Sequence, residues 1–359
     1  MKVVLNTAQL QNLVTKAVKG AGNNKLLPMT SLMAISYDGN GMLSLTTTDN
    51  TNYLTVKAMD VSMSDDELEV VVIADNFAKL ISRMTSETIT FTHESGSFFI
   101  SGGKSTYNIE LPLDVDGSEI KFERPMLTPP EIETIKLSSI KSIINTGKSA
   151  LATTLETPCY TAYYVGKNVI STDTYKICCI DEQLVKEPLL ISSETMDLLD
   201  LAESDLEYGK DKDSIGFKSV DDTFLLITKP YDGLETYSVD AIMGLVESKF
   251  KSACVVKKND ILQALDRLAI FVSQYDRNII QMSFTKNALV LKNKKSAGTE
   301  EIDYLKECDG EEFDCAIDIE MLISQIKANS VDDVTIYYGL PNCIKIADGN
   351  ITQIIALSE

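Results

Sequence analysis

The sequence predicts an α+β protein made of three similar domains, in which helices cover one face of antiparallel sheets. The first observation is a pattern that occurs three times: an apolar strand-like run, an amphipathic helix and a two-stranded hairpin. Its copies begin near Ile73, Ile191 and Ile317, about 120 residues apart, which is the length of a domain. The second observation is a related pattern that precedes each copy. The chain therefore consists of six units of β-α-β-β type, two in each domain.

The related pattern begins at residues 1, 134 and 253. In the first copy, residues 2–5 read as a strand, and Asn6 or Thr7 is a suitable N-cap. The helix then continues to about Gly20, where Gly20 and Gly22 end it. The hairpin that follows contains Asp-Gly-Asn-Gly at 38–41, a strong turn signal between two alternating runs.

The threefold pattern also predicts a second helix in each domain. In the first domain this helix spans residues 75–84, with Asp75 as its N-cap. Its buried face consists of Phe77, Leu80, Ile81 and Met84, which recur at helical spacing. The same reasoning predicts helices at residues 138–149, 193–202, 259–272 and 319–328.

Two junctions divide the chain into domains at 1–124, 125–250 and 251–359. Residues 123–133 contain three prolines, which is incompatible with regular structure and typical of a linker. The second junction, near residues 245–253, has a weaker signal. Residues 234–243 are interpreted as a loop.

Composition limits the classes of function. The net charge of −20 argues against nucleic acid as a partner if it is spread evenly, but residues 300–320 alone carry ten acidic side chains against one lysine. Other surfaces can therefore be basic. No run of 18 apolar residues occurs, so no membrane span is expected, and the N-terminus lacks the apolar core of a signal peptide. The sequence thus predicts a cytoplasmic protein.

Neither a metal nor a cofactor site is expected. The seven cysteines form no C-x-x-C pair and most lie in strand-like runs, so buried thiols are the favoured interpretation. His93 is the only histidine, and no G-x-S-x-G surrounds a serine. P-loop and calcium-loop motifs are also missing. The sequence therefore predicts a protein that is not an enzyme.

Basic residues recur on the polar faces of most predicted helices, although each one alone is ordinary for a solvated surface. A row of helices with spaced cations can follow a phosphate backbone without reading its bases. The helix at 193–202 departs from this pattern, because it carries Glu194, Asp197 and Asp200 outside. The recurring cations are Lys16, Lys19, Lys79, Arg83, Lys141, Lys148, Arg267 and Lys327.

Four stretches, taken in order, resemble the bacterial DNA polymerase III β subunit, the sliding clamp. They are LPMTSLMAISYDGNGMLSLTTTD at 27–49, VISTDTYKICCI at 169–180, YDG at 231–233 and QIIALSE at 353–359. The threefold plan and the length fit the same family, and the low identity is typical of a divergent member, such as one borne by a phage or plasmid.

The resemblance implies a homodimeric ring of six domains that encircles double-stranded DNA, with helices lining the hole. It implies a non-catalytic processivity factor that tethers the DNA polymerase, works with a clamp loader and with the associated 3′–5′ exonuclease, and docks clamp-binding peptides. The cations named above become candidates for the DNA-facing surface, together with Lys25 in a loop.

The resemblance also implies a peptide pocket and a dimer interface. In the pocket the family's Gly-His-Arg-Leu is replaced by Thr-Tyr-Lys-Ile, so the peptide preference is open. The edge strand at 106–111 would join an edge of the third domain, through Tyr107, Ile109, Ile270 and Phe271. The pocket candidates are Tyr160, Thr172, Thr174, Tyr175, Lys176, Ile177, Thr236, Ala241, Ile354, Ile355, Ala356 and Leu357.

Three other interpretations stay open. The chain could be a clamp-like scaffold that recruits replication partners without encircling DNA, which the acidic helix and the altered pocket favour. It could be an assembly protein unrelated to replication, with the candidate residues as plain core and surface. The third alternative is a hydrolase that uses His93.

Overall fold

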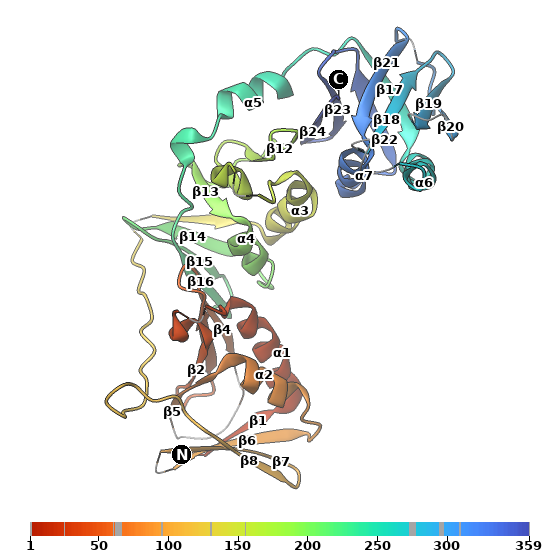
Figure 1. The fold of residues 1–359 in the computed structure, drawn as a ribbon. Coiled ribbons are helices and arrows are strands. Elements are labelled where there is room, and N and C mark those ends of the chain that lie inside the picture. The colour runs from red at the N-terminus through yellow and green to blue at the C-terminus, as the bar shows by residue number, and fades with distance from the viewer. Residues whose placement is uncertain are drawn as a thin grey trace. The chain divides into compact units, whose positions relative to one another are not determined.

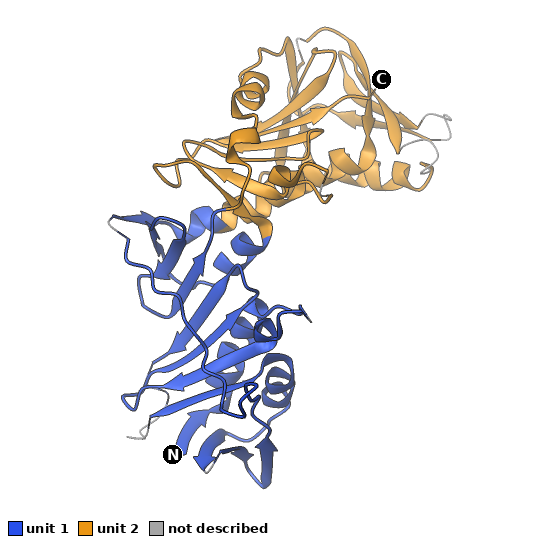
Figure 2. Ribbon diagram, turned by 60° about the vertical axis from the view of Figure 1, so that its left-hand side comes forward, with its two compact units in different colours: residues 1–140, 194–230 blue, residues 141–193, 231–359 orange. Residues whose placement is uncertain are grey.

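The computed structural model describes residues 2–24, 26–59, 61, 67–94, 96–129, 131–154, 156–272, 278–293, 298–308 and 310–358. The chain forms two compact units, residues 1–140 with 194–230 and residues 141–193 with 231–359 (Figure 2). Each unit contains one eight-stranded and one four-stranded antiparallel sheet. None of the helices in the described ranges has the length and apolarity needed to span a membrane.

The first unit is built on the hairpins of the N-terminal segment. Its four-stranded sheet has the order β1 (Lys2–Asn6), β6 (Thr88–Glu94), β7 (Ser97–Gly102), β8 (Ser105–Ile109). Its eight-stranded sheet has the order β5 (Leu68–Ile73), β2 (Leu32–Tyr37), β3 (Leu43–Thr48), β4 (Tyr53–Ala58), β16 (Phe224–Thr228), β15 (Ile215–Ser219), β14 (Leu206–Lys210), β9 (Ile132–Ile135).

The second unit repeats this plan. Its eight-stranded sheet has the order β13 (Leu189–Ser192), β10 (Ala162–Val165), β11 (Val169–Thr172), β12 (Lys176–Ile180), β24 (Ile351–Ala356), β23 (Cys343–Asp348), β22 (Asp333–Tyr338), β17 (Ser252–Lys257). Its four-stranded sheet has the order β20 (Thr299–Asp303), β19 (Ala288–Asn293), β18 (Ile279–Phe284), β21 (Phe313–Asp318).

Helices pair on one face of the sheets, as predicted. In the first unit α1 (Thr7–Ala17) packs against α2 (Ala74–Ser82), and in the second α6 (Lys258–Ala269) packs against α7 (Ile319–Ala328) (Figure 1). The core of the second unit joins Leu265 of α6 and Leu322 of α7 to strand residues such as Ile336. Burial of these helix stripes removes apolar surface from water and is the main source of stability here. The α+β prediction is therefore confirmed.

Each eight-stranded sheet consists of two four-stranded halves that are joined by one pair of strands in the middle. β4 pairs with β16, where Leu54 lies opposite Leu226, and β12 pairs with β24, where Ile177 lies opposite Ile354. In each case the last strand of one β-α-β-β repeat pairs with the last strand of another repeat in the same compact unit. The corresponding strands of the four-stranded sheets, β8 and β20, have one unpaired edge each among the described residues.

Helix bounds differ from the predictions by a few residues. Asn6 caps α1 by accepting a hydrogen bond from Gln9 N (3.1 Å). The predicted cap of α2 is wrong: α2 starts at Ala74 after Ile73, and Asp75 lies in its first turn. The α-helical parts of α1, α3 (Leu137–Gly147), α4 (Ser193–Leu199) and α6 end earlier than predicted, and α1 and α3 continue as single 3₁₀ turns.

The two junction predictions need correction. Residues 123–129 have no regular structure, as expected, but β9 already begins at Ile132, inside the predicted linker. The loop predicted at 234–243 contains a short 3₁₀ turn and the start of helix α5 (Val239–Val246). Sequence reasoning missed α5 because no side chain caps it and its stability depends on packing against the sheet. The division into three domains stays a prediction, since segment 125–250 contributes to both compact units.

Candidate nucleic-acid and partner interface

Two lysines on the helix face of the first unit lie among carboxylates. The ammonium group of Lys16 is 2.6 Å from Glu203 Oε1, and only 21% of its side chain is exposed. Lys19 is exposed at the rim of a depression of about 480 Å³ that is lined by acidic side chains. These are Asp49, Glu194, Asp197 and Asp200, so the acidic α4 borders the cations of α1.

The other cations of the first unit lie at α2. Lys79 forms an ion pair with Asp75 one helical turn earlier. Arg83, which follows the last turn of α2, is exposed and carries no ion pair among the described residues. Exposed pairs of this kind contribute little to stability and can exchange for a phosphate.

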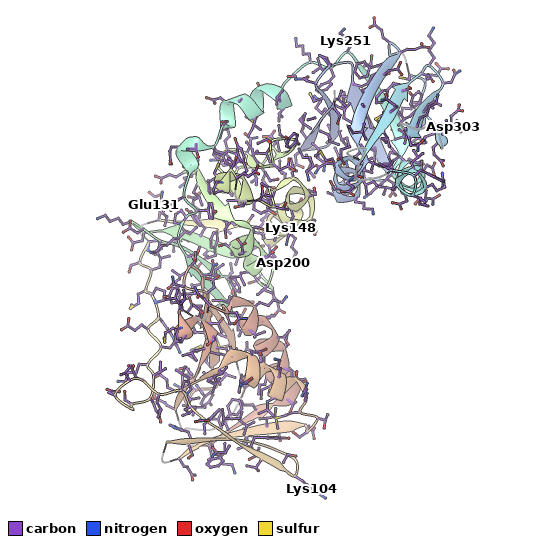
Figure 3. The ribbon with its side chains drawn as sticks, in the orientation of Figure 1. Lys104, Glu131, Lys148, Asp200, Lys251 and Asp303 are labelled. Carbon is purple, nitrogen blue, oxygen red and sulfur yellow. The ribbon has the colours of Figure 1, made fainter. Side chains whose placement is uncertain are left out.

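In the second unit, Lys141 is exposed on α3 and Lys327 is exposed on α7. Lys148, which directly follows α3, is exposed as well (Figure 3). Arg267 of α6 binds Glu300 of β20 through two hydrogen bonds, Nε to Oε1 (2.8 Å) and Nη2 to Oε2 (2.6 Å). These bonds lower the pKa of Glu300. Arg267 is thus held by its own chain, and Lys25 lies outside the described residues.

The turn between β11 and β12 holds most of the predicted pocket wall. The Thr172 hydroxyl donates to Lys176 O (2.7 Å), and the Asp173 carboxylate accepts from the backbone of Tyr175 and Lys176. Thr174 adopts a left-handed φ of 77°. The same set of bonds recurs in the β3–β4 turn, where Asn50 has φ 83°. The two hairpins are thus copies of one unit in three dimensions as well.

Behind this turn, on the face opposite the paired helices, lies an apolar cluster. Ile177 and Ile354 are buried there, and the ring of Tyr160 packs edge-on against Tyr237 with centroids 5.1 Å apart. Tyr237 donates its hydroxyl hydrogen to Ile170 O (3.2 Å). Burial raises the pKa of Tyr237, so it stays a neutral donor.

The structure separates the predicted pocket residues into two groups. Tyr175 is 61% exposed, and Thr174, Thr236 and Ala241 are exposed too. Lys176 is turned away from free solvent, since its ammonium group donates to Ser149 O (2.6 Å). Tyr175 and Lys176 directly precede Ile177 of the cluster, and half-buried Ala356 donates its N–H to Tyr175 O (2.8 Å).

Two predicted pocket residues lie on the opposite face of the sheet from Ile177 and Ile354. Because side chains alternate along a strand, Ile355 points to the helix-covered core and is fully buried, and Leu357 packs against the same core. Sequence reasoning also missed Tyr237, Ile242 and Met243, which the segment of α5 adds to the cluster. Their apolar spacing at 239, 242, 243 and 246 was a helical signal that the loop interpretation overlooked.

The predicted interface residues are exposed apolar side chains. Tyr107 on the edge strand β8 is 42% exposed, and Ile109 is half-buried. Ile270 and Phe271, which follow α6, are 77% and 52% exposed. Exposed apolar groups beside a free sheet edge are typical of a surface that another chain covers.

His93, the histidine of the hydrolase alternative, lies on β6 opposite Phe98, and its Nε2 is 3.4 Å from Glu119 Oε1.

No protein-family model matches the chain, and no curated protein matches it. Solved structures do match it over full length. The DNA polymerase sliding clamp of Bacillus subtilis is 17% identical, with 100% of this chain and 99% of that one covered and a TM-score of 0.86.

Two further matches agree with the first. The β subunit of the DNA polymerase of Streptococcus pyogenes is 16% identical, with both chains fully covered and a TM-score of 0.85. The DNA polymerase III β subunit of Thermotoga maritima is 15% identical, with 100% and 99% covered and a TM-score of 0.83. The chain therefore has the fold of the DNA polymerase III β sliding clamps.

Proposed function

We propose that this protein is a sliding clamp, a non-catalytic homodimeric ring that encircles duplex DNA and tethers a polymerase to it. The observation that carries the proposal is the series of sheet joints. β4 pairs with β16, and β12 pairs with β24. β8 and β20 are the equivalent last strands of their repeats, and each has one edge without a partner strand among the described residues. In a dimer β8 of each chain pairs with β20 of the other, so two chains close into a ring.

The chemistry of the two free edges supports this joint. β8 presents Tyr107, and Ile270 and Phe271 lie exposed after α6, whereas Ile302 of β20 is buried in the core. Exposed Glu301 and Asp303 give β20 a negative edge, whereas Lys104 is exposed at the start of β8 (Lys104 and Asp303 are labelled in Figure 3). Complementary charge sets register and favours pairing of unlike edges over like ones.

The DNA-facing surface of the ring would be the helix-covered face. Arg83, Lys141 and Lys327 expose cations there without an ion pair within the described ranges, and they are the strongest candidates for phosphate contacts. Lys16, Lys79 and Arg267 would first have to leave their carboxylates. Contact with DNA is thus weak and sequence-independent, and topology rather than affinity holds the ring on it.

The cluster of Ile177 and Ile354, with Tyr160 and Tyr237, is the proposed docking site for peptides of the polymerase, the clamp loader and the associated 3′–5′ exonuclease. Its apolar character suits a short segment with aliphatic or aromatic anchors. The proposal includes a cytoplasmic location and no cofactor.

Light scattering over a dilution series tests ring closure. The expected mass is about twice the 39.6 kDa of one chain, and Tyr107→Asp with Phe271→Asp should reduce it to one chain. A DNA test follows: after loading by a clamp loader, the protein should stay on nicked circular DNA and leave once that DNA is linearised.

A second candidate is a scaffold that recruits partners without encircling DNA, which the acidic surroundings of Lys16 and Lys19 favour. The triple variant Arg83→Glu, Lys141→Glu, Lys327→Glu separates the two, with Lys212→Glu on an exposed turn as the matched control. Reduced loading of the triple variant on circular DNA would support the clamp, whereas unaltered protein that is not released when the circle is linearised would support the scaffold and contradict the clamp.

A further inference from the structure

Lys345 lies on the outer face of the second unit's eight-stranded sheet, the face opposite the paired helices. Because side chains alternate along β23, Ile344 and Ile346 enter the helix-covered core and Lys345 points outward between them. Its partners in register are Tyr337 of β22 and Ile354 of β24. Lys345 is therefore one strand away from Ile354, within the distance at which side chains of paired strands meet.

Two aromatic rings hold the Lys345 side chain in place. Its ammonium group lies 5.0 Å from the ring centroid of Phe250 and 4.9 Å from that of Tyr337. A cation at this distance is attracted to the face of an aromatic ring. Phe250 also packs against the apolar cluster of Ile177 and Ile354, and Lys345, Phe250 and Tyr337 are each half-buried. The ammonium group is thus fixed at the border of the proposed peptide site.

Lys345 takes part in no ion pair in the described part of the chain, although it is half-buried. The carboxylates that α5 and its C-cap bring to this cluster act on other residues. Burial raises the pKa of Tyr164, and Asp240 adds to that effect. Burial also raises the pKa of Cys179, where Glu247 is one of the contributing carboxylates. The charge of Lys345 is therefore left for a ligand.

The charge of Lys345 acts inside the apolar cluster. Cys343 is a buried member of the cluster and precedes Lys345 by two residues, on the same side of β23. Burial raises the pKa of Cys343, and Lys345 acts in the opposite sense. A carboxylate that enters this space would be attracted for the same reason, because little water is left there to screen the charge.

We propose that Lys345 sets the specificity of the docking site by binding the side-chain carboxylate of an aspartate or glutamate next to the apolar anchors of a partner peptide. This role rests on the proposed function, because the cluster of Ile177 and Ile354 is the peptide site named there. The anchors would occupy that cluster, and the acidic residue would lie across β24 at the ammonium group. Phe250 and Tyr337 already restrict the lysine, so less side-chain entropy is lost on binding.

The test uses the full-length protein and short peptides that contain one tryptophan. The chain itself has no tryptophan, so indole fluorescence reports on the peptide alone. Each peptide is acetylated and amidated and carries a mixture of Leu, Ile and Phe at three successive positions. Two sets place a variable residue before or after this apolar segment, with the tryptophan at the other end. The variable residue is Glu, Gln or Lys.

In at least one set, the Glu peptides should bind at least about fivefold more tightly than the Gln peptides, and the Lys peptides should bind most weakly. Lys345→Gln should remove the difference between Glu and Gln peptides, while the Gln peptides still bind. Lys345→Arg should retain it, because a guanidinium keeps the charge and stacks on aromatic rings. Phe250→Leu should reduce it with the charge intact. Lys292→Gln, at an exposed position of β19 in the same unit, is the matched control.

Equal binding of Glu and Gln peptides in both sets, or a preference that survives Lys345→Gln, would overturn this role of Lys345 and leave the docking site standing. Absence of binding by every peptide at about 5 mM would contradict the docking site itself, and the role of Lys345 with it. Binding that Tyr160→Ala leaves unchanged would do the same, because the peptides would then lie elsewhere. The mass measured by light scattering depends on none of these outcomes, so ring closure is judged separately.

Discussion

The outer faces of the two eight-stranded sheets start from the same joint and end with different coverings. In the first unit the segment 123–129, called the strap, lies on β14 and β15 beside the β4·β16 joint, where Pro129 meets Gly209 and Leu127 meets Gly216. In the second unit β12·β24 is covered by α5, whose apolar side chains join Tyr160, Ile177 and Ile354. The same arrangement of strands therefore carries two different coverings, because the segments that cover the two sheets differ in sequence.

Ile354→Asp should lower the free energy of unfolding more than any other variant considered. It places a carboxylate among apolar residues at the β12·β24 joint, which costs about 3–5 kcal/mol of unfolding free energy, although Lys345 lies opposite in the β23–β24 register and offsets part of it. Urea unfolding measures the loss, with Ile354→Val as the conservative control at about 1 kcal/mol. A small loss for the aspartate variant would show that the cluster is open to water rather than packed.

Gly209→Val should act next most strongly, and only in the first unit. The new side chain would meet Pro129 and lift the strap from the sheet, which costs about 1–3 kcal/mol. Thermolysin cleavage between Met126 and Leu127 should accelerate, because the strap becomes accessible. If cleavage and stability stay at the level of the unaltered protein, the strap is not held by these glycines.

Gly244→Ala tests the covering of the second unit in the opposite direction. Gly244 lies inside α5 with nothing within 4 Å of its Cβ position, so alanine meets no neighbour. Alanine should stabilise α5 by about 0.5–1 kcal/mol, because it restricts the unfolded chain and favours helix. Thermal unfolding checks this, and a destabilised variant would show that α5 needs flexibility at this residue.

The smallest effect concerns pH and the turn that follows β15. Burial raises the pKa of Asp221, but hydrogen bonds from the Ser219 and Thr223 hydroxyls and from Thr223 N–H lower it to about 2, below the ordinary 3.8. Since the folded pKa is depressed, Asp221 adds stability above pH 3.8 that is lost as pH falls toward 2. Asp221→Asn should flatten this part of the curve of unfolding free energy against pH, and an unchanged slope would assign it to other carboxyls.

Sequence reasoning worked where a signal is local. The cap of α1 at Asn6 or Thr7, the bounds of α7 and the hairpin at 38–41 all follow from caps, turn residues and spacing of apolar residues, and the structure selects Asn6 as the cap. It failed at Asp75, a good capping residue that lies two positions after the actual N-cap, Ile73, and at α5, where apolar spacing was read as loop. The roles of the DNA-facing, pocket and interface residues stay predictions.

The sequence by itself determined the repeated units, their α+β class and the alternation that separates core from surface, because apolar periodicity and turn chemistry act between neighbours in the chain. Only the tertiary structure decided which strands join at β4·β16 and β12·β24 and that Ile355 faces the core beside outward-facing Ile354. It also decided that Lys16 and Arg267 meet carboxylates and that the strap lies on two glycines. These contacts join residues tens to hundreds of positions apart, and no local pattern encodes their distance in space.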